Sequence, residues 1–252
     1  MGARGFRSGI IGVFFLLGVF CGGEVRAAGE VDHGIYGRLL AKYVAGGTVD
    51  YRGLKTEERT LDEYLGLIEQ TKTGDLPPKE QLAFYINAYN ACTLKLVLGG
   101  YPGVKSIKEL GGVFSSPFKK KICKIDGRPL SLDEIEHEII RPRFKDPRVH
   151  FALNCASKGC PPLASGPYRG AALDGWLDEA ARAFVNDPSR YRLDGGKLSV
   201  SMIFKWYAPD FGDGALGFIR KYADGDLGRT LTAGGDRIKV GYLDYDWSLN
   251  GK

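Results

Sequence analysis

Hydrophobic side chains in the N-terminal half of the chain recur at helical spacing. Apolar residues return every three to four positions over 31–44 and over 60–72, so each segment is expected to form a helix with one buried face. A third helix is expected to begin at Pro77-Pro78, because proline is tolerated in a first turn, and to end at Gly99-Gly100. This last helix is apolar nearly all round, which is typical of a helix buried on every side. We therefore expect it to be the central helix of the protein.

Alternation of polar and apolar residues predicts strands farther along the chain. Residues 121–130 have the pattern of a hairpin that turns at Asp126-Gly127, and residues 191–200 have the pattern of a second hairpin with a Gly-Gly turn. The apolar run 149–154 is expected to be a buried strand, and residues 238–245 the last strand.

Further helices are expected between and after these strands. Ser131 and Glu134 form the capping-box pattern of a helix start, and Pro142 is expected to end that helix. Three more helical patterns follow, over 173–184, 204–207 and 216–222. Helices first, and then strands mixed with helices, indicate an α+β fold. We expect a helical N-terminal half packed on a small, mostly antiparallel sheet.

The composition fits a globular domain and argues against a nucleic-acid partner. Of 252 residues, 44% are hydrophobic and 26% are charged, a balance normal for globular proteins. The formal net charge is +5, and the densest positive cluster, residues 119–121, leads into the first predicted hairpin, where it is more simply a solvated strand edge. Nucleic-acid binding would need a basic stripe interleaved with aromatic residues, and the sequence has none.

The N-terminus has the pattern of a cleavable signal peptide. Two arginines precede a short apolar run over 10–20, and Val25-Arg26-Ala27 offers the small residues that a signal peptidase prefers. The apolar run is shorter than the ~20 residues that span a bilayer, so no stable membrane span is expected after cleavage. We expect residues 1–27 to be a signal peptide and residues 28–252 to form one periplasmic or secreted domain.

Export changes the interpretation of the four cysteines that remain. Cys155 and Cys160 lie in the loop CASKGCPPL, and an oxidising compartment favours a disulfide between them. A free Cys155 or Cys160 could instead attack an acyl carbon, with backbone amides of the loop steadying the oxyanion. Zinc binding by both cysteines with His137 and His150 is a third alternative, but the spacing matches no short metal motif. In the fourth alternative the cysteines are simply small hydrophobic residues packed in the core. We expect no metal and no cofactor.

His137 and His150 are the candidate bases for such a nucleophile. His150 stands five residues before Cys155, and an odd separation on a regular strand places two side chains on opposite faces. His137, from the preceding helix, is therefore the better-placed base. His150 suits Cys160 only if the loop folds back.

Two asparagines are the unusual residues of the central helix. Asn87 and Asn90 stand three apart and so lie on one helix face. A buried amide must find hydrogen-bond partners. We favour a structural interpretation, in which both clamp a neighbouring segment such as the cysteine loop, over a role in orienting an imidazole or binding substrate.

The C-terminal third contains candidate pocket residues. Lys205, Trp206 and Tyr207, followed by Asp210, combine aromatic surface with charge, as a pocket wall does. We expect a small-molecule or peptide ligand there. Trp247 is expected to anchor the C-terminal segment by docking on the domain.

Four stretches together resemble the domain of unknown function family 547. They are residues 84–98, residues 132–143 with 149–163, residues 203–212, and residues 242–250. The resemblance implies an exported bacterial protein, since the family contains exported bacterial proteins and plant proteins with an added coiled-coil segment. It implies nothing definite about chemistry, because the activity of the family is unsettled.

A distant analogy to papain- and transglutaminase-like enzymes is limited by where the cysteines lie. In those enzymes the nucleophile opens the central helix, whereas Cys92 lies well inside it here. We favour a ligand-binding or accessory domain with a Cys155–Cys160 disulfide. The alternative is a cysteine-dependent hydrolase or acyltransferase with Cys155 as nucleophile, His137 or His150 as base, and Asn87 or Asn90 as the orienting residue.

Overall fold

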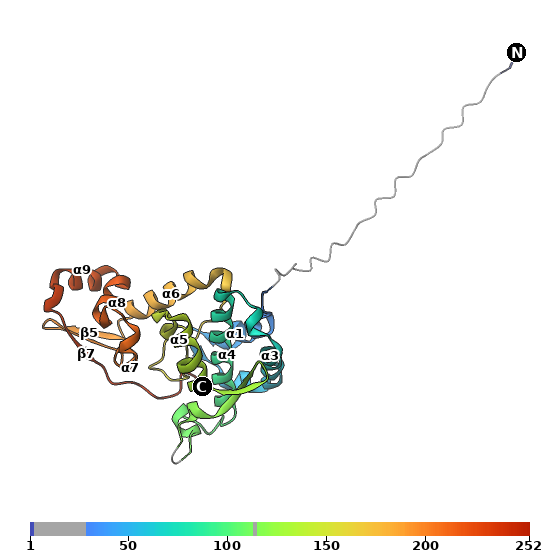
Figure 1. Cartoon of the computed structure of the whole chain (residues 1–252), viewed down its shortest axis with the longest axis horizontal. Coiled ribbons are helices and arrows are strands. Elements are labelled where there is room, and N and C mark those ends of the chain that lie inside the picture. Colours follow the sequence, from blue (N-terminus) through green and yellow to red (C-terminus); the bar gives the residue numbers. More distant parts are fainter. Residues whose placement is uncertain (3–28, 113–114) are drawn as a thin grey trace.

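The first half of the protein is a group of helices around one buried helix (Figure 1). A computed structural model describes residues 1–2, 29–112 and 115–252, so the signal peptide expected over 1–27 lies almost entirely outside the described residues. The elements of this half are α1 (Gly34–Tyr43), β1 (Val44–Ala45), β2 (Thr48–Val49), α2 (Tyr51–Thr56), α3 (Glu58–Gln70) and α4 (Pro78–Leu98). Every residue of α4 from Glu80 to Leu94 is buried, which confirms the expected central helix.

A hairpin and an irregular helix follow the central helix. Strands β3 (Lys121–Ile125) and β4 (Arg128–Ser131) pair antiparallel, as expected, and Cys123 on β3 forms a disulfide with Cys92 on α4. The capping box is also confirmed. The amide of Glu134 donates to Ser131 Oγ at 3.2 Å, and the amide of Ser131 donates to Glu134 Oε2 at 2.7 Å.

Pro142 does not end this helix, so that prediction is wrong. The helix begins as a π-helical segment, η4 (Glu134–Ile140), and continues as α5 (Arg141–Phe144). Within the wide turns the amide of Arg141 bonds to the carbonyl of Glu136, five residues back. Pro142 then falls in the first turn of α5, where its missing N–H is tolerated.

The strand expected over 149–154 is wrong as well. Residues Pro147–Phe151 form a 3₁₀ helix, η5, whose first turn is capped by Asp146. A short buried apolar run fits a strand and a buried helical turn equally well. Here Asp146 and Pro147 favour the helical turn, because a capping aspartate followed by proline is typical of a helix start. His150 and Cys155 therefore do not lie on opposite faces of one regular strand, as the sequence pattern had predicted.

The second half has its own hydrophobic cluster, which is formed mainly by residues of α6 (Leu173–Asn186) and of the elements after it. Strands β5 (Tyr191–Asp194) and β6 (Lys197–Val200) form the expected hairpin, and β7 (Lys239–Tyr242) adds to β6 in parallel. The helices are α7 (Ile203–Trp206), α8 (Gly214–Tyr222) and α9 (Gly225–Gly234). Helix α9 was not among the expected helices, and Leu227 and Leu231, one turn apart, bury its inner face.

The described residues confirm an α+β fold, with strands divided among small sheets. Two of these sheets have two strands and one has three, instead of the single sheet expected. Figure 1 shows α6 extending between the two groups of elements. The remaining short 3₁₀ segments are η1 (Thr73–Asp75), η2 (Ile107–Leu110), η3 (Pro117–Lys119), η6 (Gly170–Ala172), η7 (Ala208–Asp210) and η8 (Gly235–Arg237).

The C-terminal segment returns from the second cluster to the first. Asn250 accepts a hydrogen bond from Tyr51 at 2.7 Å, and its backbone bonds to Val49 and Ala156 at 3.1 Å each. Leu249 pairs with Ser157. The segment therefore docks as expected, but the hydrogen bonds that hold it here are those of Leu249 and Asn250 and not those of Trp247.

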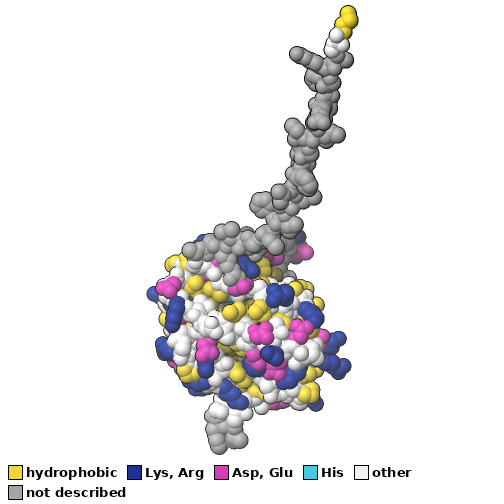
Figure 2. Space-filling model, turned by 90° about the vertical axis from the view of Figure 1, so that its right-hand side faces the viewer, with side chains coloured by type: hydrophobic (Ala, Val, Ile, Leu, Met, Phe, Trp, Pro, Cys, Tyr) yellow, Lys and Arg dark blue, Asp and Glu magenta, His cyan; other side chains and the backbone are white. Residues whose placement is uncertain are grey.

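The surface carries both signs of charge. On the face shown in Figure 2, Lys and Arg side chains are interspersed with Asp and Glu. Within the described part of the chain, every helix is too short or too polar to cross a bilayer.

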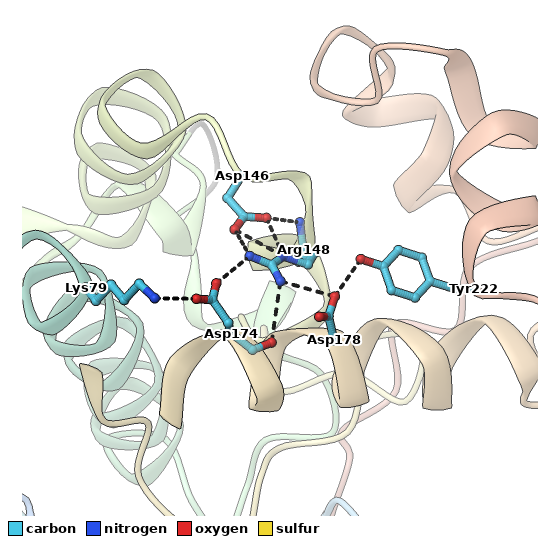
Figure 3. A network of polar contacts seen from close by, with 6 residues as sticks. All are labelled: Lys79, Asp146, Arg148, Asp174, Asp178 and Tyr222. Carbon is cyan, nitrogen blue, oxygen red and sulfur yellow. Dashed lines mark hydrogen bonds and ion pairs between the residues drawn. The ribbon is translucent and has the colours of Figure 1, made fainter. Parts of the chain in front are cut away.

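An arginine-centred network joins the two halves (Figure 3). Arg148 of η5 binds Asp146 at 2.6 Å and two carboxylates of α6, Asp174 at 3.0 Å and Asp178 at 3.1 Å. Lys79 of α4 reaches Asp174, and Tyr222 of α8 donates to Asp178 at 2.8 Å. Elements from both hydrophobic clusters therefore meet at one guanidinium.

Replacing Arg148 with methionine is expected to destabilise the protein by about 1–2 kcal/mol at neutral pH and low salt, because three carboxylates lose a shared partner. Hydrogen bonds from Lys79 and then Arg148 lower the pKa of Asp174. The Tyr222 hydroxyl and Arg148 lower that of Asp178 against the effect of burial. Lowered carboxyl pKa values stabilise the fold above the unfolded value of about 4, and this stabilisation is lost as the pH falls through the folded-state values.

Urea unfolding at pH 7 and near pH 3 would measure this effect. The difference between wild type and Arg148→Met should shrink at the lower pH. Arg59→Met, whose side chain is 94% exposed, is the matched control and should change little. A difference that is equally large at both pH values would contradict an electrostatic role.

Candidate functional site

A pocket of about 200 Å³ lies where the two hydrophobic clusters meet. Its floor comes mainly from the segment 133–161, and its wall comes from α7 and the C-terminal segment. The lining residues are Tyr89, Phe118, Asp133, Glu136, His137, His150, Leu153, Cys155, Cys160, Pro161, Ile203, Trp206, Tyr207, Tyr245 and Trp247. The structure thus brings together most of the residues singled out in the sequence.

A buried imidazole lies in the floor. His150 Nε2 is 2.7 Å from Asp210 Oδ2, and Arg141 binds the same carboxylate through two nitrogens at 2.6 and 2.9 Å. Burial alone would raise the pKa of Asp210, but the hydrogen bonds from Arg141 and His150 outweigh it and lower the pKa. Burial lowers the pKa of His150 against the pull of Glu136 and Asp210, which favours a neutral imidazole.

Glu136 adds a second carboxylate beside this imidazole, and this one is buried. Its Oε1 lies 4.0 Å from His150 Nδ1, so the ring stands between two acidic side chains. Tyr207 stacks on the imidazole with ring centroids 3.9 Å apart. Burial, and then the nearby Glu136, raise the pKa of both Tyr89 and Tyr207, so these phenols stay protonated and can donate to the carboxylate.

The wall of the pocket is aromatic. The ring of Trp206 lies 4.7 Å from that of Tyr245 and 5.7 Å from that of Trp247. Lys108 Nζ lies 4.0 Å from the centroid of Trp247. One ring of this aromatic group thus makes a cation–π contact within the protein. Lys205, expected in the same site, lies instead over Tyr242, which is outside the pocket lining.

Cys155 and Cys160 form a disulfide in the pocket floor, with Cα atoms 6.1 Å apart. The contacts of Cys155 Sγ include the hydroxyls of Ser157 at 3.1 Å and Tyr245 at 3.4 Å. In this oxidised state neither cysteine offers a thiolate to an acyl carbon or to zinc. Among the described residues, no cluster of three or more His, Cys, Asp or Glu side chains is arranged to hold a metal ion.

The two candidate bases are engaged elsewhere. His137 is exposed, and its Nδ1 lies 3.0 Å from Arg141 Nη1. His150 is bonded to Asp210, as described above. Both imidazoles line the same pocket as Cys155, but their hydrogen bonds go to Arg141 and Asp210.

The side chains of Asn87 and Asn90 form hydrogen bonds with backbone groups of the segment 152–168. The Asn87 amide bonds to the carbonyl and the amide of Tyr168 at 2.8 and 2.9 Å. The Asn90 amide bonds to the carbonyl of Ala152 and the amide of Asn154 at 2.9 and 2.8 Å. The two side chains thus clamp the segment that carries the disulfide at its start and its end. They lie outside the pocket lining.

Sequence reasoning missed the partners that complete the site. Glu136, Arg141 and Tyr245 were not expected there, and Asp210 was expected only as part of a pocket wall. Their residue types are suited to proton transfer and charge stabilisation, but 60 residues separate His150 from Asp210. Two of them, Glu136 and Arg141, share a segment with His137, which is the one local hint the sequence offers.

The described residues therefore define an α+β protein with a preformed, partly aromatic pocket that has a disulfide in its floor. Residues 73–185 match the model of the family described as "Protein of unknown function, DUF547". No curated protein and no solved structure matches the chain. The floor of the pocket lies within the matched segment, whereas the wall residues Trp206, Tyr207, Tyr245 and Trp247 lie beyond it.

Proposed function

We propose that this protein is an exported binding protein whose pocket holds a small molecule or a peptide. The pattern of its N-terminus supports export, and two disulfides suit an oxidising compartment. Location in the periplasm or outside the cell follows from this proposal.

The observation that carries the binding function is the pairing of an aromatic wall with a buried carboxylate in one pocket. Trp206, Tyr245 and Trp247 offer apolar faces, and Glu136 is 6% exposed and acidic. Ligand pockets generally combine apolar surface with a few placed polar groups. The ligand that fits best has an apolar or aromatic body and a hydrogen-bond donor, such as an amine, directed at Glu136.

A titration with simple aromatic probes would test this proposal. Benzylamine should bind more tightly than benzyl alcohol, and benzoate should bind least, because only the amine offers a positive donor to the carboxylate. In a Trp176→Phe background the two remaining tryptophans, Trp206 and Trp247, both report on the pocket by fluorescence.

Two substitutions make the test specific. Trp206→Ala should weaken benzylamine binding about tenfold, since a ring–cation contact is worth roughly 1–2 kcal/mol. Glu136→Gln should remove the preference for the amine over the alcohol. Preferential binding of benzoate, or equal affinities in all variants, would refute the proposed ligand class.

The cysteine hydrolase or acyltransferase remains the alternative proposal, and it requires a reduced Cys155. Support for it is limited to the shared pocket of Cys155 with two imidazoles. Alkylation without reductant, followed by mass spectrometry of protein from its export compartment, would decide the thiol state. Linked Cys155 and Cys160 would exclude it in that state.

A further inference from the structure

The two sulfurs of the pocket disulfide lie in different surroundings. Cys155 is half-buried and Cys160 is 4% exposed, and both line the pocket. A thiol that enters the pocket can therefore approach Cys155 more easily than Cys160. The second disulfide differs, because Cys92 and Cys123 are 0% and 1% exposed inside the first hydrophobic cluster.

The buried sulfur is surrounded by hydrogen-bond donors. The amide of Cys155 lies 2.9 Å from Cys160 Sγ, the hydroxyl of Tyr245 donates to it at 3.2 Å, and the hydroxyl of Ser157 lies at 3.5 Å. Hydrogen bonds to a charged acceptor are stronger than those to a neutral one. The two hydroxyls also reach Cys155 Sγ, at 3.1 and 3.4 Å, so the amide is the donor that sets Cys160 apart. Together these donors favour a thiolate on Cys160 over the neutral disulfide.

The loop between the cysteines is held in the shape that aims these donors. Ala156 has a positive φ of 60°, unusual for a residue with a side chain. Its amide donates to Asn154 Oδ1 at 2.9 Å, and its carbonyl accepts from the amide of Asn250 at 3.1 Å. The donor arrangement is thus fixed by contacts outside the disulfide itself.

We propose that Cys155–Cys160 is a reactive disulfide that oxidises thiols entering the pocket. The thiolate of the substrate attacks Cys155 Sγ, and the bond between the two protein sulfurs breaks. Its electron pair goes to Cys160, which leaves as a thiolate held by the Cys155 amide and the Tyr245 hydroxyl. The product is a mixed disulfide between the substrate and Cys155.

A second substrate thiolate then completes the reaction. It attacks the substrate sulfur of the mixed disulfide, an external disulfide is released, and Cys155 leaves as a thiolate. In sum, two thiols lose two electrons and two protons and become one disulfide, while the protein disulfide takes up the two electrons and two protons and becomes a dithiol. The substrate class is a small thiol or a cysteine-containing peptide. This activity goes beyond ligand binding and does not depend on the ligand proposed above.

Reduction by glutathione would test the reaction directly. The oxidised protein is incubated with reduced glutathione, quenched with N-ethylmaleimide at intervals, and mapped by mass spectrometry. We expect Cys155 and Cys160 to be labelled at least about tenfold faster than Cys92 and Cys123, because attack requires access to a sulfur. Equal resistance of the two disulfides would overturn the proposal.

Two sets of variants test the direction of attack and the role of the donors. With oxidised glutathione, the single cysteine left in the pocket by Cys160→Ser should form a mixed disulfide faster than the one left by Cys155→Ser. Tyr245→Phe keeps the ring but removes the donor, so it should slow cleavage by glutathione about tenfold. Tyr242→Phe, at an exposed tyrosine outside the pocket, is the control and should react as wild type does. Unchanged cleavage in Tyr245→Phe would refute thiolate stabilisation at Cys160.

Discussion

Replacing Cys92 and Cys123 together with alanine is expected to lower the free energy of unfolding by about 3–4 kcal/mol. The disulfide joins residues 31 apart in the chain, so its loss frees a long loop in the unfolded state. It also links the central helix α4 to strand β3, both within the first hydrophobic cluster. Urea unfolding of the non-reduced proteins would measure the change.

The pocket disulfide provides a matched control for this effect. Cys155 and Cys160 are only five residues apart, so their replacement by serine should cost about 2 kcal/mol in the same entropy model. The long-loop variant should therefore be the less stable of the two. The reverse order would show that loop entropy does not govern the stability of this protein.

Replacing Asn90 with alanine is expected to destabilise the protein by about 3 kcal/mol. The side chain satisfies a buried carbonyl, that of Ala152, and a buried amide, that of Asn154. Alanine leaves both groups without this partner in a dry environment. The expected fall in the midpoint of thermal unfolding is about 6–12 °C for a domain of this size.

Asn87→Ala separates stability from pocket structure. It removes an equivalent pair of hydrogen bonds, to Tyr168, and should destabilise the protein by a similar amount. Only Asn90→Ala should also weaken benzylamine binding, because Asn90 holds the residues directly before Cys155. Equal binding in the two variants would contradict a role of Asn90 in shaping the pocket.

Local patterns in the sequence predict much of the fold. The central helix, the two hairpins and the capping box of Ser131 and Glu134 depend on neighbours in the chain, so periodicity and turn residues suffice to find them. The strand assigned to 149–154 fails because a buried apolar run lacks the period that separates strand from 3₁₀ helix. Pro142 fails as a helix end because a π-helical turn before it shifts the hydrogen bonding.

The candidate site is less predictable, because tertiary contacts create it. His150 and Cys155 are recognisable as reactive residue types, but the bond of His150 to Asp210 depends on how η5 packs against η7. The same is true of Tyr245, whose hydroxyl reaches both sulfurs from 85 or more residues away. A disulfide, a nucleophile and a zinc site share residue types, so only geometry separates them.

The return of the C-terminal segment has a consequence for the order of folding. Val49 pairs with Gly251, and Tyr51 with Asn250, which closes a loop of nearly the whole described chain. Contacts this distant in sequence form late and slow the folding rate. The wall residues Tyr245 and Trp247 arrive with the same segment. Neither a ligand nor a thiol can therefore meet a finished site on a chain that is still being synthesised.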